Sequence, residues 1–139
     1  MSKNNIAVTV DSVIFCKTNN NFKVLLVQRK NEPYKDEWAL PGGFVEENED
    51  LETAAKRELK EETGLSIESM QQVQAFGKPN RDPRGHTISI AFLSRIYSEE
   101  KLKAADDAKD AKWFDLEKLP DMKLAFDHDE IINVAQQFL

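Results

Sequence analysis

The sequence predicts an α/β (α+β) fold in which a mixed β-sheet is covered by two helices. Two observations lead to this expectation. The β-branched runs at 6–15 and 22–28 are typical of strands, and apolar residues recur at helical spacing over 50–63 and 127–138. The chain of 139 residues has no internal repeat and no break in composition that would mark a linker. We therefore expect residues 1–139 to form a single domain.

A β-hairpin is predicted first, because the polar tract 17–21 separates the two β-branched runs. The segment 30–36 contains Pro33 and has little periodicity, which indicates a loop. The later strands are predicted at 38–45, where a short strand reaches the Gly42-Gly43 turn, at 70–78 and 87–97 on either side of the turn-rich loop 79–86, and at 111–114.

The central helix is predicted over 50–63, where four apolar residues recur at helical spacing: Leu51, Ala54, Ala55 and Leu59. Either Asn48 or Asp50 is the expected N-cap, and Gly64 is the expected C-terminal stop. These start and stop signals agree with the periodicity, so this helix is the most strongly specified element of the chain.

Two further helical segments are predicted near the C-terminus. Residues 116–119 form a helical turn that Pro120 is expected to stop. Asp127 is the expected cap of a closing helix, with Glu130 three residues further on. One face of that helix is apolar and consists of Ile131, Val134, Ala135 and Phe138.

Composition excludes several classes of protein. With 40% hydrophobic and 32% charged residues, 5 Gly and 5 Pro, the chain is neither disordered nor of low complexity. A net charge of -6 argues against binding to nucleic acid or to anionic lipid, so an anionic partner would need a bridging cation. The single Cys16 and the absence of an apolar leader or an 18-residue apolar run predict a cytoplasmic protein with no membrane partner.

Three glutamates of the central helix break the usual helical pattern. At about 100° per residue, Glu58 and Glu62 continue the apolar stripe, and Glu61 lies on its flank. They also occupy the negative end of the helix dipole and repel each other, at roughly 0.3 to 1 kcal/mol for each misplaced charge. A hard divalent cation held by oxygen ligands would turn this repulsion into coordination.

The spacing around these glutamates resembles the Nudix box. Gly43 is followed after five residues by Glu49, and after seven more by Arg57-Glu58-Leu59-Lys60-Glu61-Glu62-Thr63-Gly64-Leu65. All fixed positions of the box are filled, over 23 of 139 residues. The resemblance implies the Nudix fold, an α/β/α sandwich on a mixed sheet, and hydrolysis of a nucleoside diphosphate linked to another moiety with Mg²⁺ or Mn²⁺.

The resemblance also implies roles for individual residues. Glu58 and Glu62 would be the principal metal ligands, with Glu61 as a further ligand or a water partner and a carbonyl of the Gly42-Gly43 turn as another. The catalytic set implied by the resemblance is Glu58, Glu61, Glu62 and Arg57. Within it, Arg57 would form a buried pair with Glu49 that steadies the loop against the helix, which is a supporting role. Gly43 and Gly64 are also explained by a turn and a helix C-cap.

A second resemblance concerns the substrate. The stretch 75–90, with 38–45 before it and 124–128 after it, is similar to the bacterial ADP-ribose pyrophosphatase branch, and Pro79 lies 15 residues past Gly64, near the marker proline of that branch. ADP-ribose would be hydrolysed to AMP and ribose 5-phosphate. Similar segments occur in Nudix-related regulators that sense ADP-ribose through a domain joined to a winged helix, and from the end at Leu139 we expect no DNA-reading part.

Substrate contacts are expected from Arg81 and Arg84, since guanidinium groups pair bidentately with phosphate, although a plain surface turn explains both equally well. Gly43 and Phe44 are further candidates. Three aromatic side chains could stack on adenine or could belong to the core: Trp38, Phe44 and Phe76.

Other points stay open at this stage. His86 and His128 are interpreted as structural. The general base could be a glutamate of the box or one of the downstream acids Asp82, Glu99, Glu100, Asp106 and Asp107. Alternative functions are a Nudix hydrolase for a nucleoside triphosphate or NADH, and a non-catalytic ADP-ribose sensor. The resemblance also suggests a homodimer.

Overall fold

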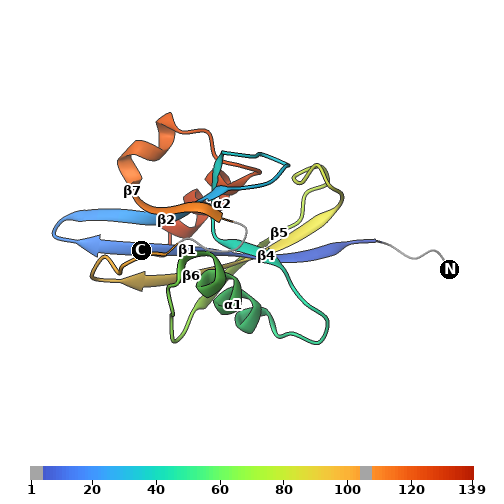
Figure 1. Ribbon diagram of the computed structural model, residues 1–139, viewed down its shortest axis with the longest axis horizontal. Helices are drawn as coiled ribbons and strands as arrows, with labels where there is room; N and C mark the ends of the chain where they lie inside the picture. The colour runs from blue at the N-terminus through green and yellow to red at the C-terminus, as the bar shows by residue number, and fades with distance from the viewer. Residues whose placement is uncertain (1–4, 104–107) are drawn as a thin grey trace.

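Within residues 5–103 and 108–139, which the computed structural model describes, seven strands form one mixed sheet (Figure 1). Two α-helices and one 3₁₀ helix complete this part of the chain. The elements in chain order are β1 (Ala7–Thr18), β2 (Asn21–Arg29), β3 (Trp38–Ala39), β4 (Gly42–Phe44), α1 (Leu51–Thr63), β5 (Gln71–Phe76), β6 (Thr87–Ile96), β7 (Ala108–Asp115), η1 (Leu116–Asp121) and α2 (His128–Gln136).

The order of the strands is β3-β2-β1-β6-β5, with β4 added beside β1 and β7 beside β2. The pairing of β1 with β6 is parallel and runs from Ala7 opposite Thr87 to Cys16 opposite Ile96. All the other pairings between these strands are antiparallel. The expected mixed sheet is therefore confirmed.

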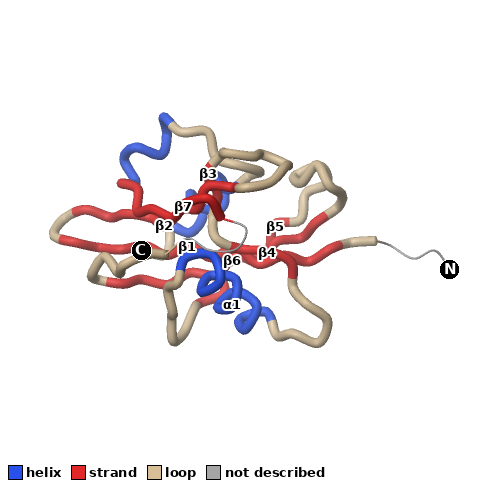
Figure 2. The backbone as a smooth tube through the Cα atoms, viewed as in Figure 1, coloured by secondary structure: helices blue, strands red, loops and turns tan. Residues whose placement is uncertain are grey.

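The two α-helices cover opposite faces of the sheet, with α1 below it and α2 with η1 above it in Figures 1 and 2. Alternation along β1 follows from this arrangement. Val13 and Phe15 pack in the larger core beneath α2, whereas Val10 and Ile14 pack against α1. A strand covered on both faces needs apolar residues on both, which explains why eight consecutive residues of β1, from 9 to 16, are buried.

The strands β1 and β2 diverge, and this divergence creates the space for the site. They pair only next to their hairpin, from Phe15 opposite Val24 to Thr18 opposite Asn21. Nearer its start, β1 pairs instead with β4, where Thr9 lies opposite Phe44. The segment that connects β3 to β4 enters between the two strands, and the Ser12 amide donates to the Pro41 carbonyl at 2.8 Å.

The boundaries of several elements differ from the sequence expectation. The hairpin turn is only Asn19-Asn20, because Asn19 adopts a positive φ of 56° that suits a two-residue connection. Pro120 lies inside η1 rather than after it, since the φ of proline is compatible with a 3₁₀ helix. The strand predicted at 111–114 extends over Ala108–Asp115 because it pairs with β2 along nearly its whole length.

Two expectations for the last helix need correction. Asp127 occupies the N-cap position of α2 as predicted, but its side chain makes no capping hydrogen bond and its carboxylate binds Arg81 instead. Phe138 lies beyond the end of α2 and is exposed, because the last residues change to i→i+3 hydrogen bonds, with the Phe138 amide donating to the Ala135 carbonyl. That tighter winding rotates Phe138 away from the apolar face.

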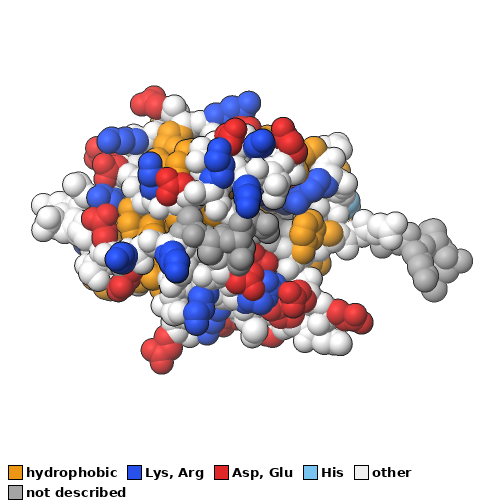
Figure 3. Space-filling view, in the orientation of Figure 1, with side chains coloured by type: hydrophobic (Ala, Val, Ile, Leu, Met, Phe, Trp, Pro, Cys, Tyr) orange, Lys and Arg blue, Asp and Glu red, His pale blue; other side chains and the backbone are white. Residues whose placement is uncertain are grey.

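The surface is mixed in charge. On the face shown in Figure 3, acidic and basic side chains alternate with small apolar areas, and no broad patch of one sign is visible. Among the helices of the described residues, none has the length and apolar character required to cross a bilayer.

Candidate active site

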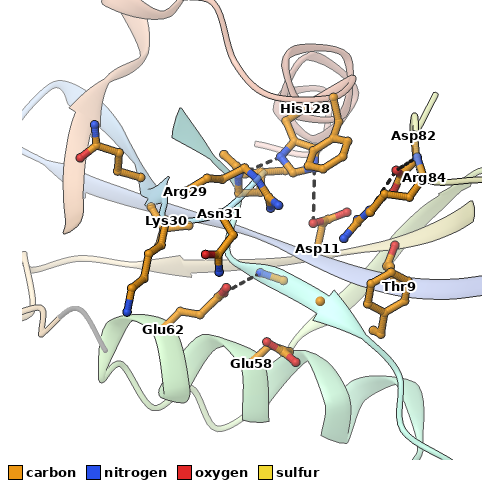
Figure 4. A pocket seen from close by; sticks show the side chains of 18 of the residues that line it. Thr9, Asp11, Arg29, Lys30, Asn31, Glu58, Glu62, Asp82, Arg84 and His128 are labelled. Atoms are coloured by element: carbon orange, nitrogen blue, oxygen red, sulfur yellow. Dashed lines mark hydrogen bonds and ion pairs between the residues drawn. The ribbon is translucent and has the colours of Figure 1, made fainter. Parts of the chain in front are cut away.

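A cavity of about 480 Å³ opens where β1 and β2 diverge (Figure 4). Its volume lies in the range of small-molecule sites in proteins. Six separate parts of the chain contribute to its walls, as expected for a site at a fork in a sheet. The side chains used below are Asp11 from β1, Arg29 and Lys30 from the end of β2, Phe44 from β4, Glu58 and Glu62 from α1, Arg81, Asp82 and Arg84 from the loop before β6, and Phe126 and His128 near the start of α2.

The acidic wall comes from α1, whose ends follow the sequence signals. The carboxylate of Asp50 caps the helix by accepting from the Glu52 amide, and Gly64 ends it with a φ of 76°. The phase between these ends turns Glu62 inward, where it is only 8% exposed, and Glu58 lines the same cavity. The prediction that Glu58 and Glu62 follow the apolar stripe is confirmed.

The glycine turn fits closely against these glutamates. The Gly42 amide donates to Glu62 Oε2 at 2.8 Å (Figure 4). A Cβ atom at position 43 would lie 2.7 to 2.8 Å from the carboxyl atoms of Glu58. A Cβ atom at position 42 would lie 2.1 Å from the Val10 carbonyl oxygen. Position 42 therefore excludes a side chain because the clash is with backbone, whereas a side chain at position 43 would require the Glu58 carboxylate to move.

Arg57 connects α1 to the loop before it, as the resemblance implies. Its Nε donates to Glu49 Oε2 at 2.7 Å, and one Nη donates to Glu49 Oε1 at 3.0 Å. These hydrogen bonds lower the pKa of Glu49 to about 2. The other Nη of Arg57 donates to Glu58 Oε1 at 2.9 Å and to Glu61 Oε2 at 3.3 Å, so Arg57 also orients the acidic wall.

The acidic wall has the chemistry of a hard-metal site. Glu58 and Glu62 present carboxylate oxygens beside a turn with no side chains, and oxygen is the ligand that Mg²⁺ and Mn²⁺ prefer. Glu61 is 45% exposed and does not line the cavity, so its role as a further ligand stays a prediction. In residues 5–103 and 108–139, no three acidic, His or Cys side chains already converge as a metal-ligand group. The residues fit a metal that is shared with a ligand oxygen or water, and the Gly42 carbonyl as a further ligand stays a prediction.

The opposite wall presents Arg84. Its Nε and Nη2 donate to Asp82 at 3.1 and 2.8 Å, and its guanidinium carbon lies 4.8 Å from the centre of the Phe44 ring and 5.4 Å from that of Phe126. Although burial raises the pKa of Asp82, the hydrogen bonds from Arg84 outweigh it and lower the pKa overall. Arg84 is 39% exposed, so a planar cationic group is held at the cavity and remains accessible.

Arg81 lies deeper in the same wall and has a different environment. Its side chain is only 4% exposed, and it donates to both carboxylate oxygens of Asp127, at 2.9 and 2.5 Å. Burial alone would lower the pKa of Arg81, but Asp127 raises it, so the guanidinium stays charged. The pair joins the loop before β6 to the start of α2, and the predicted substrate contact of Arg81 remains a prediction.

The structure separates the other candidates. Among the downstream acids, Asp82 lines the cavity, Glu99 binds Lys23 at the surface at 3.2 Å, and Glu100 does not line it, whereas Asp106 and Asp107 lie outside the described residues. Trp38 and Phe76 pack in the core, and the remaining aromatic candidate, Phe44, faces the cavity. His86 lies outside the cavity, and its Nε2 is 3.0 Å from the Gly77 carbonyl oxygen.

Several residues that line the cavity were not among the sequence candidates, and Asp11, Arg29 and Lys30 are the charged ones used here. Asp11 interrupts the apolar run of β1, and that interruption was the one local sign that could have identified it. Arg29 ends β2, Lys30 follows it directly, and both add positive charge to the cavity. Figure 4 shows Lys30 extending along the side of the cavity where Glu62 lies. His128, interpreted as structural, is buried and also lines the cavity.

Comparison with known proteins identifies the class. A NUDIX domain is matched over residues 8–134, so the chain belongs to the Nudix family. An ADP-ribose pyrophosphatase from Methanocaldococcus jannaschii is 52% identical over 127 residues, which are 91% of this chain and 71% of that protein. The ADPR responsive transcriptional repressor NtrR of Acinetobacter baylyi is 35% identical over 92% of this chain, which spans about half (52%) of the repressor's length.

Solved structures agree with this assignment. The NUDIX domain of Shewanella oneidensis NrtR, complexed with ADP ribose, has a TM-score of 0.91 and 33% identity over 97% of this chain and 89% of that one. A MutT/nudix family protein from Enterococcus faecalis has a TM-score of 0.90 and 40% identity, covering 97% of this chain and 62% of its own. The similarity therefore includes the whole sheet and both α-helices, and the predicted Nudix fold is confirmed.

Proposed function

We propose that this chain hydrolyses ADP-ribose to AMP and ribose 5-phosphate and uses Mg²⁺ or Mn²⁺ to do so. The Nudix domain and the 52% identity to an ADP-ribose pyrophosphatase support a Nudix pyrophosphohydrolase. A further relative, a bifunctional NMN adenylyltransferase/ADP ribose pyrophosphatase from Francisella tularensis that was solved with AMP and an Mn ion, is 37% identical with a TM-score of 0.85, over 94% of this chain and 41% of its own.

One observation carries the proposal. Glu58 and Glu62 form one wall of the same cavity in which Arg84 and Phe44 form another. In ADP-ribose the negatively charged pyrophosphate lies in the middle of the molecule, with adenosine on one side and a ribose on the other. Carboxylates suit this ligand only through a cation, whereas a guanidinium and an aromatic ring suit its phosphate and ring groups directly.

The chain contributes positioning and charge to the reaction. Hydrolysis adds one water molecule across the pyrophosphate bond, so that one phosphorus receives oxygen from water and the other keeps the bridging oxygen. A bound divalent metal would supply positive charge to the pyrophosphate and make the attacking water more acidic. Glu58 and Glu62 would hold that metal, Arg57 would keep Glu58 in place, and Arg84 would neutralise phosphate charge from the other wall.

The positions of the acidic side chains reduce the number of candidates for the general base. Within residues 5–103 and 108–139, Asp82 and the box glutamates are the candidates that remain near the cavity. The hydrogen bonds from Arg84 that lower the pKa of Asp82 make it a weaker base, which favours a glutamate of the box.

A substrate panel tests the proposal. ADP-ribose, NADH and a nucleoside triphosphate are incubated with the chain, with and without Mg²⁺, and the products are separated by chromatography. We expect AMP and ribose 5-phosphate from ADP-ribose in the presence of Mg²⁺ only. A clear preference for the triphosphate or for NADH would overturn the choice of substrate and leave the class of enzyme intact.

A second candidate function is sensing of ADP-ribose without hydrolysis. It is favoured by the 35% identity to the ADPR responsive repressor of A. baylyi and by the similarity to the ADP ribose complex of S. oneidensis NrtR. Calorimetry distinguishes the two functions, because a sensor would bind ADP-ribose tightly in the presence of Mg²⁺ and release no AMP over hours.

We also propose that the active form is a homodimer, which rests on the resemblance to the ADP-ribose pyrophosphatase branch. Light scattering measures this directly. A mass near twice the 15.9 kDa of one chain is expected, and a mass near 15.9 kDa would contradict it.

A further inference from the structure

A buried histidine on the far side of the cavity from α1 binds the segment that leads into the glycine turn. His128 is the first residue of α2, is only 4% exposed and lines the cavity. Its Nδ1 accepts a hydrogen bond of 2.9 Å from the Leu40 amide, and its Nε2 lies 3.5 Å from Asp11 Oδ1. The proposed function gives no role to His128 or to its contacts with Leu40 and Asp11.

The contact with Leu40 defines the state of the ring. A backbone amide can only donate, so Nδ1 must be unprotonated in order to accept from it. The neutral ring then carries its proton on Nε2, which faces the carboxylate of Asp11. Burial of His128 lowers its pKa, and this favours the same neutral form.

The segment that His128 holds is the one that meets the glutamates. Backbone groups of three successive residues bind three different elements. The Leu40 amide donates to the His128 side chain of α2, the Pro41 carbonyl accepts from the Ser12 amide of β1, and the Gly42 amide donates to the Glu62 side chain of α1. The distances of these three hydrogen bonds are 2.9, 2.8 and 2.8 Å. Gly42 and Gly43 are so close to Asp11 and Glu58 that a small shift of the segment would change the position of both side chains.

Asp11 gives His128 a second connection to the same segment. Its carboxylate accepts from the buried Ser89 hydroxyl and lies against Gly42, where a Cβ atom would be 2.5 Å from Asp11 Oδ1. The two ring nitrogens of His128 thus reach the segment at Leu40 directly and at Gly42 through Asp11 (Figure 4).

We propose that His128 is a positioning residue for the metal-binding glutamates, which acts by holding the Leu40–Gly43 segment through its Nδ1 acceptor. The proposal gives His128 no direct bond to the metal or the substrate; its effect on the glutamates passes through the backbone of the segment. The inference rests on the proposed function only in taking Glu58 and Glu62 as the metal ligands, and it does not depend on which nucleotide is hydrolysed.

The first test examines the ring in the wild-type protein. Nitrogen-15 chemical shifts of the imidazole, recorded by NMR near pH 7.5, distinguish a protonated from an unprotonated ring nitrogen. We expect Nδ1 of His128 to be unprotonated and Nε2 to be protonated. A proton on Nδ1 would overturn the proposal, because that nitrogen could not then accept from Leu40.

The second test uses two variants, each of which places an amide group near the position of one of the two ring nitrogens. His128→Asn retains an oxygen acceptor at the place of Nδ1, whereas His128→Gln places its amide nearer to Nε2 and loses that acceptor. Binding of Mn²⁺ to the full chain is measured by electron paramagnetic resonance with no nucleotide present. We expect the dissociation constant to rise about 10-fold in H128Q and less than about threefold in H128N, by analogy with other residues that orient metal ligands.

His86→Asn is the matched control, because His86 lies outside the cavity and contacts Gly77 instead. Its Mn²⁺ dissociation constant should equal that of the wild type. Equal losses in H128N and H128Q, or an unchanged constant in H128Q, would overturn the proposal. If both variants fail to fold, the nitrogen shifts of the wild-type protein decide. If the Mn²⁺ dissociation constants follow the expected order but the wild-type chain does not cleave ADP-ribose, the proposed function is refuted and the role of His128 is not.

Discussion

Neighbouring glutamates of α1 have different environments at this site. Glu62 is nearly buried and accepts from the Gly42 amide, whereas Glu61 is about half exposed and pairs with Arg57. Two adjacent acids in one helix therefore have different environments. The phase of the helix predicted this difference from the sequence, because it depends only on residues within three turns.

Replacing Glu62 should remove activity and leave the fold in place. In Glu62→Gln the side chain keeps its size and can still accept from Gly42 through its amide oxygen, but it loses the negative charge. We expect hydrolysis of ADP-ribose with Mg²⁺ to fall by at least about 100-fold, while the circular dichroism spectrum stays that of the wild type. Glu61→Gln is the neighbouring control, with a smaller loss. Turnover of E62Q near the wild-type rate would show that Glu62 is not a metal ligand.

Gly43→Ala tests the close approach of the turn to α1. The new methyl group would lie under 3 Å from the carboxyl atoms of Glu58, so the carboxylate must move away from the turn. We expect a higher Mg²⁺ concentration for half-maximal activity, with only a small change in melting temperature because the Glu58 side chain can shift. Gly77→Ala is the comparison, since its added methyl would meet only Ile88 at 3.3 Å, outside the cavity. Unchanged Mg²⁺ dependence in G43A would contradict this account.

At the scale of the elements, local signals were sufficient and pairings over long sequence distances were not. The cap and stop of α1, at Asp50 and Gly64, follow from residues within one turn of each end. The partner of Asp127 could not be predicted, because capping of α2 is a local interaction and Arg81 lies 46 residues away. The tertiary ion pair replaced the local cap. The fork between β1 and β2 was equally hidden, since it depends on the insertion of 40–43 between them.

The pair of Arg57 and Glu49 predicts a dependence of stability on acid. The pKa of Glu49 is about 2 in the folded protein and near 4.5 for a free glutamate. The folded value is the lower one, so the pair contributes stability that is fully present above pH 4.5 and is lost as the pH falls toward 2. Urea unfolding between pH 6 and pH 2.5 should show a smaller loss of stability in Glu49→Gln than in the wild type. Parallel curves for the two proteins would contradict the ion pair.

At the scale of the whole molecule, metal binding should be coupled to stability. The site joins α1 to the segment between β3 and β4. A ligand that binds only the folded state raises the free energy of unfolding by RT ln(1 + [L]/Kd). At a concentration 100 times the dissociation constant, Mn²⁺ would add about 2.7 kcal/mol. Thermal unfolding with and without Mn²⁺ measures the shift. We expect a clear rise for the wild type and little for Glu58→Gln combined with Glu62→Gln; an equal rise in that double variant would place the metal elsewhere.

The origin of the cavity walls has a consequence for how such a protein can change during evolution. One wall is built into the box helix and the glycine turn, which are tied to the sheet by backbone hydrogen bonds. The other wall comes from the connections 30–36 and 78–86 and from Phe126, which lie at the ends of strands or between elements. Loops tolerate substitution better than the elements they join. A protein that receives these loops from a relative should therefore acquire the nucleotide preference of that relative, while the residues that break the bond are inherited unaltered.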